Sequence, residues 1–479
     1  MRKMDHMKEM GHSIGSMKQD EKYYIEHPGA MMLEHPSMYP WIQPIVMLLG
    51  VWLIFSPMTL GYRSPAMTWS DIISGAVAIA IALFALISPR HAWVSYGNTF
   101  VGLWLLFAPL IFWASDAAAY ETDTLIGAFL ILFSFIIPMS MEMPGPEVPP
   151  GWSYNPSTWV QRAPIIALGL FGFFLARYMA GYQLGYLSSV WDPFFGEGTN
   201  IILKSEVSKA WPISDAGLGA VVYLIEALSG AMGDARRWRT MPWMVAIFGL
   251  AVIPLGVVSV ALVIMQPLVI GQWCTLCLVA AGAMLVMIAL SLDEVIAMIQ
   301  FLAKSHRAGK PWWRVFWTGG TLPDAQEKAG PDRLPSWEPS AMAWGVTAGW
   351  NLIVSTAVGI WLLFAPALFG IDTRSSSADS DRLVGALVIT IAVIAWAEVG
   401  RTARYLNLLL GAWLVVGTWF LSGGSPAIHW SDTLSGLLLI LLSFPLGRIR
   451  DAYGSFGQYV TWMPGRKIEK PAERQRKAA

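Results

Sequence analysis

The segment Gly50-Val-Trp-Leu-Ile-Phe-Ser-Pro57 is apolar, ends in a proline and recurs along the chain. Near copies are Gly102-Leu-Trp-Leu-Leu-Phe-Ala-Pro109 and Gly359-Ile-Trp-Leu-Leu-Phe-Ala-Pro366, and Gly411-Ala-Trp-Leu-Val keeps only the beginning. About 19 residues after each tryptophan comes a second element, a Ser-Asp or Thr-Asp pair followed by a glycine. Self-similarity of this kind indicates a repeated structural unit. The sequence therefore predicts four copies of a two-helix hairpin, two on each side of a centre without the repeat.

Each residue type in this unit suggests a physical role. Proline cannot donate the hydrogen bond that continues a helix, so it is expected to end the outgoing helix. Ser or Thr followed by Asp is expected to cap the returning helix, where a carboxylate meets the positive end of the helix dipole. Glycine permits close helix contact. These eight helices are interpreted as a scaffold, with an ion or partner site at the aspartates as the alternative. The four aspartates are Asp71, Asp123, Asp381 and Asp432.

The composition indicates a membrane protein. Of the 479 residues 55% are apolar and 13% are charged, whereas about 25% would be charged in a soluble protein. Apolar runs of about 18 residues or more are long enough to span a membrane. They form helices there, since hydrocarbon offers no hydrogen-bond partner to free backbone groups. The sequence thus predicts an all-α polytopic membrane protein with about twelve transmembrane helices. Their approximate limits are 41–60, 71–88, 93–113, 124–141, 163–186, 214–233, 242–265, 270–301, 346–369, 382–399, 405–424 and 432–447.

Charged residues in the loops predict the orientation. Every second connection is basic, and short cytoplasmic loops are enriched in Lys and Arg. An even number of spans then places both termini in the cytoplasm of what we expect to be a bacterial inner or plasma membrane. The zero net charge and the lack of a basic stripe make nucleic acid an unexpected partner. The basic connections contain Arg90, Arg162, Arg236, Arg237, Arg239, Lys304, Arg307, Lys310, Arg314, Arg401, Arg404, Arg448 and Arg450.

The two cysteines of the chain, Cys274 and Cys277, form one Cys-x-x-Cys at the predicted outer start of a central span. A thiol at a helix N-terminus has a lowered pKa, and a cysteine one turn further on is close enough for a disulfide. The outer side of the membrane also sustains disulfide exchange. This favours a redox-active pair. Two alternatives remain, inert core cysteines and a metal site, although zinc needs four ligands and the segment has no His or further Cys.

Two family resemblances follow from these motifs. The hairpin units resemble the SPW-repeat membrane family. The stretch Ile202-Leu-Lys-Ser205, then Trp211-Pro-Ile-Ser-Asp-Ala-Gly-Leu-Gly-Ala-Val-Val-Tyr223, and the Cys-x-x-Cys about fifty residues later resemble the vitamin K epoxide reductase family. That second resemblance implies a four-helix bundle over 163–301 that binds a quinone beside an outward-facing Cys-x-x-Cys.

The resemblance also implies roles for individual residues. Cys274 would exchange electrons with a thiol partner, and Cys277 would pass them to the quinone. Ser205 would occupy the serine position of a lid over the quinone, and Tyr223 would line the pocket. Asp215 stands about where some members have an Asn that hydrogen-bonds the quinone oxygen. We therefore treat Cys274 and Cys277 as candidate catalytic residues, Ser205, Asp215 and Tyr223 as candidate cofactor-binding residues, and no residue as a metal ligand.

The sequence departs from the family in the loop that precedes the second central span. Members usually hold a second cysteine pair there, whereas residues 187–213 contain none, and Thr199 lies roughly where a relay cysteine would fall. The position four after Cys277, often Tyr in the family, is Ala281. Either a separate dithiol protein reduces the Cys274–Cys277 disulfide directly, or the pocket has another purpose.

Arg177 and Glu226 fall at similar predicted depth in two neighbouring central spans. Charges inside a membrane are costly, so such residues are usually paired or functional. We expect a structural ion pair between them, with a quinone-linked proton path as the alternative.

Three functional hypotheses follow. The first is a membrane thiol–disulfide oxidoreductase that couples an extracytoplasmic thioredoxin-like dithiol protein to a quinone. The second is a non-catalytic binding or assembly protein that retains a quinone- or lipid-binding core. The third, transport, is disfavoured, because broken helices with polar groups clustered at the midplane are lacking.

The expected segments are 1–40, a cytoplasmic Met/His-rich tail; 41–141, repeats one and two; 142–162, a cytoplasmic linker; 163–301, the bundle; 302–343, a second cytoplasmic linker; 344–448, repeats three and four; and 449–479, a cytoplasmic tail.

Overall fold

The computed structural model describes residues 41–135, 148–321, 339–372 and 374–462, and the predicted tail at 1–40 lies outside them. These residues form helices joined by loops, with two isolated β-bridges and no strand in the described part. The long helices are α3 (Ile42–Leu60), α4 (Pro65–Ile87), α5 (Gly97–Ile111), α6 (Ala117–Ser134), α7 (Trp159–Gln183), α10 (Asp215–Ala231), α12 (Pro242–Met265), α13 (Thr275–Arg307), α15 (Trp350–Leu368), α16 (Ser376–Ile394), α17 (Leu406–Val416) and α18 (Pro426–Ser443). The shorter ones are α8 (Gly198–Leu203), α9 (Glu206–Lys209), α11 (Arg237–Thr240), α14 (Trp312–Thr318) and α19 (Gly457–Val460).

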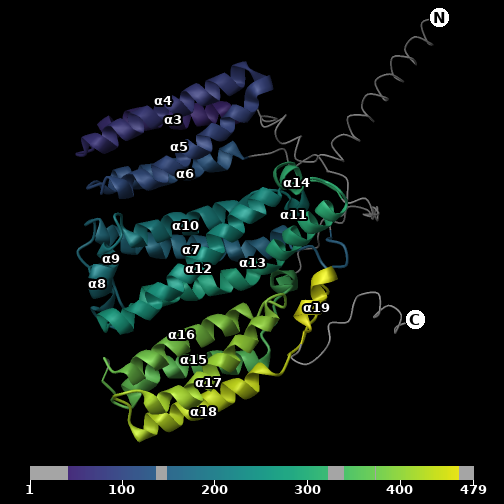
Figure 1. Cartoon of the computed structure of the whole chain (residues 1–479). Coiled ribbons are helices and arrows are strands. Elements are labelled where there is room, and N and C mark those ends of the chain that lie inside the picture. Colours follow the sequence, from purple (N-terminus) through teal and green to yellow (C-terminus); the bar gives the residue numbers. More distant parts are fainter. Residues whose placement is uncertain (1–40, 136–147, 322–338, 373, 463–479) are drawn as a thin grey trace, which may run out of the picture.

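The long helices stack in three layers (Figure 1). The first layer contains α3–α6, the N-terminal hairpins. The central bundle contains α7, α10, α12 and α13, and the third layer contains α15–α18, the C-terminal hairpins. Within the outer layers α3 packs on α4, α5 on α6, α15 on α16 and α17 on α18, while α7 packs on α10 and α12 on α13 in the bundle. The loop that carries α8 and α9 lies at one end of the bundle, and α11 and α14 lie at the other.

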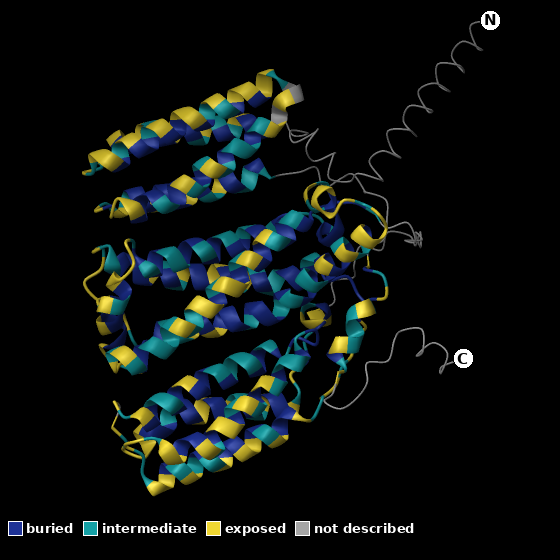
Figure 2. Cartoon of the chain, viewed as in Figure 1, coloured by how far each residue is buried: buried dark blue, intermediate teal, exposed yellow. Residues whose placement is uncertain are grey.

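Each of the twelve predicted spans overlaps a helix, and the chain is an all-α, multi-pass membrane protein. Eight described helical stretches are long and apolar enough to cross a membrane: α3, α4, α5 with the preceding turn from Trp93, α6, α7, α12 with the turn that follows it to Ile270, α13 and α15. The other four expected spans fall on α10, α16, α17 and α18, of which α10 has 17 residues and α17 has 11. Exposed residues lie along the outward faces of the layers (Figure 2), and many are large apolar side chains such as Leu48, Leu250 and Leu441, as lipid contact requires.

The predicted close helix contacts at glycines are present in all four hairpins. A Cβ atom on Gly127 would lie 2.7 Å from the carbonyl oxygen of Gly102, and one on Gly102 would lie 2.6 Å from the carbonyl oxygen of Gly127. Any side chain at these positions would push the two helices apart, so glycine sets the spacing of each hairpin. The same close approach joins Gly50 to Gly75, Gly359 to Gly385 and Gly411 to Gly436.

The prediction that the four aspartates cap the returning helices is wrong. Those helices begin about one and a half turns earlier, and Ser64, Ser375 and Ser425 cap three of them by accepting a backbone N–H. Proline follows Ser64 and Ser425 and is favoured in the first turn, which moves the helix start upstream. The outgoing helices likewise run two or three residues past Pro57, Pro109 and Pro366.

The serine before the aspartate has a different role from the one expected. Trp104 donates its indole N–H to the hydroxyl of Ser70 over 3.0 Å, so the tryptophan of the second hairpin binds the first. Trp361 and Ser431, and Trp413 and Ser380, repeat this bond over 2.9 Å in the C-terminal layer. The two elements of the repeat therefore recognise each other between hairpins.

The aspartates themselves face each other across each pair of hairpins. Asp71 meets Asp123 in the N-terminal layer, Asp381 meets Asp432 in the C-terminal layer, and none is more than 1% exposed. In the first pair, Asp71 Oδ1 and both carboxyl oxygens of Asp123 lack a protein donor. Two acceptors that face each other need a hydrogen between them, since a buried polar atom without a partner is costly.

An Asp123→Asn variant is therefore expected to keep, or to raise by up to about 1 kcal/mol, the free energy of unfolding, because the amide donates to the facing carboxyl. Asp123→Ala removes the contact and leaves a cavity, so its thermal midpoint in detergent should fall. Thermal unfolding of the two variants beside the parent protein measures both effects. An Asn variant that melts as early as the Ala variant would contradict this account of the pair.

A buried ion pair holds the end of the central bundle opposite the cysteines. Arg237 of α11 donates from Nε and Nη2 to the two carboxylate oxygens of Glu294 on α13, both over 2.6 Å. Its Nη1 donates to the carbonyl oxygen of Met232 over 2.9 Å, and the hydroxyl of Ser157 donates to Glu294 Oε1 over 2.5 Å. The two charged side chains are almost fully buried. This cluster ties the segments before α7 and after α10 to α13.

Candidate functional site

The two cysteines lie at the start of α13 and are joined by a disulfide with a Cα–Cα distance of 5.3 Å. Cys274 is the N-cap residue, and its sulfur accepts the backbone N–H of Cys277 over 3.1 Å. Gly271 has φ +74° at the end of the π-helical turn Gln266–Ile270, and the backbone there turns from α12 into α13. The Cys-x-x-Cys thus sits at a helix N-terminus, as predicted.

The two sulfur-bearing residues differ in their surroundings. Cys274 has no exposed surface, whereas Cys277 is partly buried. The backbone N–H of Cys274 donates to Gln266 Oε1 over 3.1 Å, and the sulfur of Cys277 lies 3.8 Å from that of Met179. Exchange with an external thiol is the role expected of Cys274 from the family resemblance. In this conformation no external thiol reaches it.

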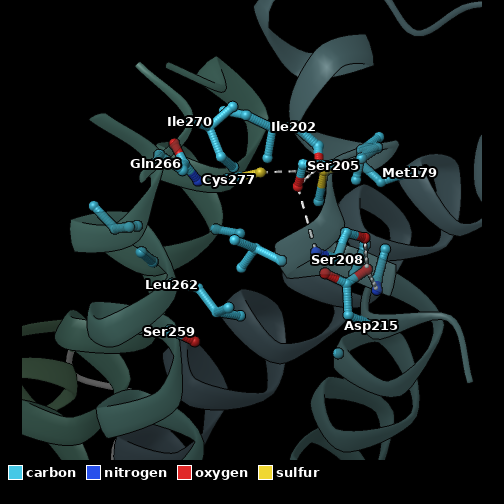
Figure 3. Close-up of a pocket in the computed structure, with 18 of the residues that line it drawn as sticks. Met179, Ile202, Ser205, Ser208, Asp215, Ser259, Leu262, Gln266, Ile270 and Cys277 are labelled. Atoms are coloured by element: carbon cyan, nitrogen blue, oxygen red, sulfur yellow. Dashed lines mark hydrogen bonds between the residues drawn. The ribbon is translucent and has the colours of Figure 1, made fainter. Parts of the chain in front are cut away.

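A cavity of about 120 Å³ lies between α7, α10, α12 and α13 and the loop that carries α8 and α9. It brings together Cys277 and the three predicted cofactor-binding residues, Ser205, Asp215 and Tyr223, while Cys274 does not line it. Figure 3 shows Ser205, Ser208 and Asp215 on one side and Gln266 beside Cys277 on the other. The remaining walls are mostly apolar: Ala176, Met179, Ile202, Leu203, Val207, Ala216, Gly219, Ser259, Leu262, Val263, Ile270, Ala280 and Ala281.

Local structure orients the polar side chains around the cavity. Ser205 caps the short helix α9 by accepting the N–H of Ser208, and its hydroxyl donates to the carbonyl oxygen of Ile202 over 2.7 Å. Tyr223 donates its hydroxyl to the carbonyl oxygen of Ala280 over 2.8 Å, so its ring is held against α13. The hydroxyl hydrogens of both residues are used in these hydrogen bonds, and both side chains shape the cavity wall.

Asp215 is the first residue of α10 and accepts hydrogen bonds on Oδ1. The donors are Gln183 Nε2 over 2.5 Å, the hydroxyl of Ser208 over 2.9 Å and the backbone N–H of Ala216 over 2.8 Å. Gln183, the last residue of α7, also donates to the carbonyl oxygen of Leu203. Asp215 therefore joins α7 and α10 to the loop that covers the cavity.

Gln266 is a site residue that was not predicted from the sequence; it lines the cavity and accepts a hydrogen bond from Cys274. Its Oε1 accepts from the Cys274 backbone, so its NH2 group with two donor hydrogens remains for other partners. Gln266 is 3% exposed. A clue was present in the sequence, because Gln266 follows an apolar run from residue 242 that only Ser259 interrupts, and it stands eight residues before Cys274.

Asp192 was also missed, and it connects the loop to the start of α13. Its two carboxylate oxygens accept hydrogen bonds from both the hydroxyl and the backbone N–H of Thr199 and of Thr275. The backbone N–H groups of Phe194 and Phe195 complete the set. Burial acts to raise the pKa of the Asp192 carboxyl, but these hydrogen bonds outweigh it and hold the pKa below its usual range.

The predicted ion pair between Arg177 and Glu226 is wrong. Arg177 of α7 pairs with Glu121 of α6 and lies over the ring of Tyr120, so it joins the central bundle to the N-terminal hairpins. Glu226 is fully buried, and neither of its carboxyl oxygens has a hydrogen-bond partner. The two side chains do not meet, because Arg177 on α7 reaches Tyr120 and Glu121 on α6, whereas Glu226 is a buried residue of α10.

The described ranges contain no group of three or more His, Cys, Asp or Glu side chains that could hold a metal ion. The histidines at positions 6, 12, 27 and 35 belong to the segment that precedes the described part.

Comparison with protein families adds to this geometry. Residues 163–292 match the model of the vitamin K epoxide reductase family. Residues 40–137 and 349–444 match the SPW repeat domain. No curated protein and no solved structure gives a match. Both expected resemblances are thus confirmed, and the vitamin K epoxide reductase match includes the cavity and part or all of each helix of the central bundle.

Proposed function

We propose that the protein is a membrane thiol–disulfide oxidoreductase. The proposal starts from the vitamin K epoxide reductase family domain that residues 163–292 form between two SPW repeat domains. The protein would oxidise an extracytoplasmic dithiol protein, thioredoxin-like in kind, and reduce a quinone. The observation that carries the proposal is that Cys277, one half of a disulfide at a helix N-terminus, lines a mostly apolar cavity.

The residues around the cavity fit a quinone. A flat, largely apolar ring with carbonyl oxygens suits apolar walls with few polar groups. Gln266 supplies N–H donors beside Cys277, whereas the Asp215 carboxylate can only accept, and its Oδ1 already accepts from three donors. We therefore assign the quinone-oxygen contact to Gln266 in place of Asp215. A bound quinone supplies an acceptor for two electrons and two protons.

The exchange half of the reaction proceeds at the disulfide. A thiolate of the partner attacks the sulfur of Cys274, the Cys274–Cys277 bond breaks, and Cys277 leaves as a thiolate. The second thiolate of the partner then attacks the partner's own sulfur in the mixed disulfide and releases Cys274. The partner is oxidised to a disulfide and the cysteine pair is reduced by two electrons.

The second half returns the cysteine pair to the disulfide. Cys277 faces the cavity and Cys274 lies one turn away, so the pair can re-form its bond while two electrons pass into the cavity. The two protons lost by the partner's thiols accompany them. The net reaction converts the dithiol of the partner and a quinone into the disulfide of the partner and a quinol.

The test uses purified full-length protein with a reduced thioredoxin-like protein and a soluble quinone. The parent protein should oxidise the thiol protein with quinone present, and a Cys274→Ser/Cys277→Ser double variant should not. A Ser291→Ala variant on α13 serves as the matched control, since its hydroxyl bonds only within the helix, to the carbonyl oxygen of Ile288. A thiol state that does not respond to quinone in the parent protein would refute the proposal.

Complete burial of Cys274 favours a second candidate function, a non-catalytic binding or assembly protein. In that case the bundle would retain a quinone or lipid in the cavity, and the hairpins would provide the contact surface. The same double variant separates the two. It should keep the cellular role if binding alone is the function, and lose that role if exchange is.

A further inference from the structure

The loop between α7 and α10 covers the buried cysteine. We call residues 187–213 the covering loop; it contains Asp192, Thr199 and the helices α8 and α9. Phe195 stacks on Trp273 with ring centroids 6.3 Å apart, directly before Cys274 in the sequence. Gly198 also packs so tightly on the Trp273 carbonyl that a Cβ there would collide with it. The loop therefore closes over the segment that leads into the Cys-x-x-Cys.

Asp192 is the side chain that fastens this loop to α13. Through Oδ2 it accepts the hydroxyl of Thr199 over 2.6 Å and the backbone N–H of Thr275 over 3.4 Å. Through Oδ1 it accepts the hydroxyl of Thr275, the residue after Cys274. One carboxylate thus bridges α8 and the first residue of the redox helix. Hydrogen bonds to a charged acceptor are stronger than neutral ones, so this is the firmest polar contact between loop and helix.

Disulfide exchange needs access that the closed loop denies. The attacking thiolate must come into bonding distance of the Cys274 sulfur, and Cys274 has no exposed surface. The rate of exchange with any external thiol is then the intrinsic rate multiplied by the fraction of molecules in which the loop has opened. The contacts that hold the loop shut set that fraction.

We propose that Asp192 is a latch that controls access of thiols to Cys274, a positioning residue outside the electron-transfer chemistry itself. Release of its bonds to Thr199 and Thr275 lets the covering loop move away and exposes the Cys274 sulfur. This proposal rests on the proposed function only for the identity of the natural thiol partner. The closure of the loop over the disulfide does not depend on whether a quinone accepts electrons.

Asp192→Asn tests the latch. The asparagine places an NH2 group toward some of the N–H and O–H groups that donate to the carboxylate in the parent protein. Donor then faces donor, so the loop should open more often. The measurement is the rate at which dithiothreitol reduces the Cys274–Cys277 disulfide of the full-length protein in detergent, followed by alkylation and mass spectrometry. We expect a rate roughly tenfold above that of the parent, equivalent to about 1.4 kcal/mol in the opening equilibrium.

Glu197→Gln is the matched control. Glu197 lies in the same loop and accepts from Asn200 Nδ2 over 2.7 Å, but it does not reach α13. Its reduction rate should stay at the parent value. Thr199→Val removes one hydroxyl donor and leaves the carboxylate in place, so it should give a smaller increase than Asp192→Asn and remains informative if the Asp192 variant folds poorly.

The reduction rates of these variants test the role of Asp192 separately from the proposed function. Unchanged or slower reduction in both Asp192→Asn and Thr199→Val overturns it, and so does an equal increase in Glu197→Gln, which would indicate general loosening of the loop. The proposed function fails separately, if the parent protein reduced by dithiothreitol is not reoxidised by quinone. Faster reduction in the variants would then still support the latch.

Discussion

An Arg237→Ala variant is expected to lose about 3–5 kcal/mol of unfolding free energy, because it leaves the buried carboxylate of Glu294 without its cation. Arg237 and Glu294 form a two-bond ion pair, and both are almost fully buried. The loss is larger than for a typical substitution, since a single ion in an apolar interior costs far more than a missing contact. Thermal or denaturant unfolding in detergent measures it.

Arg307→Ala is the matched control for this prediction. Arg307 ends the same helix α13 but is exposed, so its removal should change stability by less than about 0.5 kcal/mol. Adding Glu294→Gln to Arg237→Ala should recover part of the loss, because the uncompensated charge is then gone. An Arg237→Ala protein as stable as the Arg307→Ala protein would show that the ion pair does not support the bundle.

A Gln266→Leu variant is expected to bind quinone roughly 10- to 100-fold more weakly, since the cavity loses its amide donor and the Cys274 N–H loses its acceptor. Leucine is close in size, so the cavity keeps its shape. Equilibrium binding of a soluble quinone analogue, followed by calorimetry, measures the change. The rate of reduction of the disulfide by dithiothreitol reports separately on the cysteine pair.

Gln266→Glu distinguishes the two roles of this side chain. A glutamate keeps an oxygen for the Cys274 N–H but has no N–H to donate while ionised. Quinone binding should therefore fall as far as in Gln266→Leu, while the geometry at the start of α13 is retained. Full quinone affinity in Gln266→Glu would show that Gln266 only supports Cys274, and the quinone contact would have to come from another group.

Several features of the fold could be read from the sequence, because they depend on patterns within one segment. The apolar runs mark the helices, and the repeated glycines mark where two helices of one hairpin touch. The Cys-x-x-Cys could be placed at a helix start since the apolar span follows directly. Ser205, Asp215, Tyr223 and Cys277 were placed around one pocket from their resemblance to a known family, and the cavity brings these four together.

The wrong predictions at Asp123 and Arg177 both involve contact between segments far apart in the sequence. Asp123 looked like a helix cap because its neighbour in the chain is Thr122, but the helix begins earlier and the carboxyl faces Asp71 in another hairpin. Arg177 was paired with Glu226 by estimated depth, whereas its side chain extends to Glu121 of α6. Depth along a helix is visible in a sequence, and the direction of a side chain around the helix is not.

A multi-pass helical protein with four repeated hairpins around a bundle that carries one cysteine pair could be inferred from the amino-acid sequence. These properties follow from the length of apolar runs and from local spacing, which each segment carries independently. The burial of Cys274, the bonds of Asp192 between the covering loop and α13, and the position of Gln266 between the redox helix and the cavity became visible with the folded structure. Such contacts arise when packing brings loops and helices of different segments together, and no single segment contains the information for them.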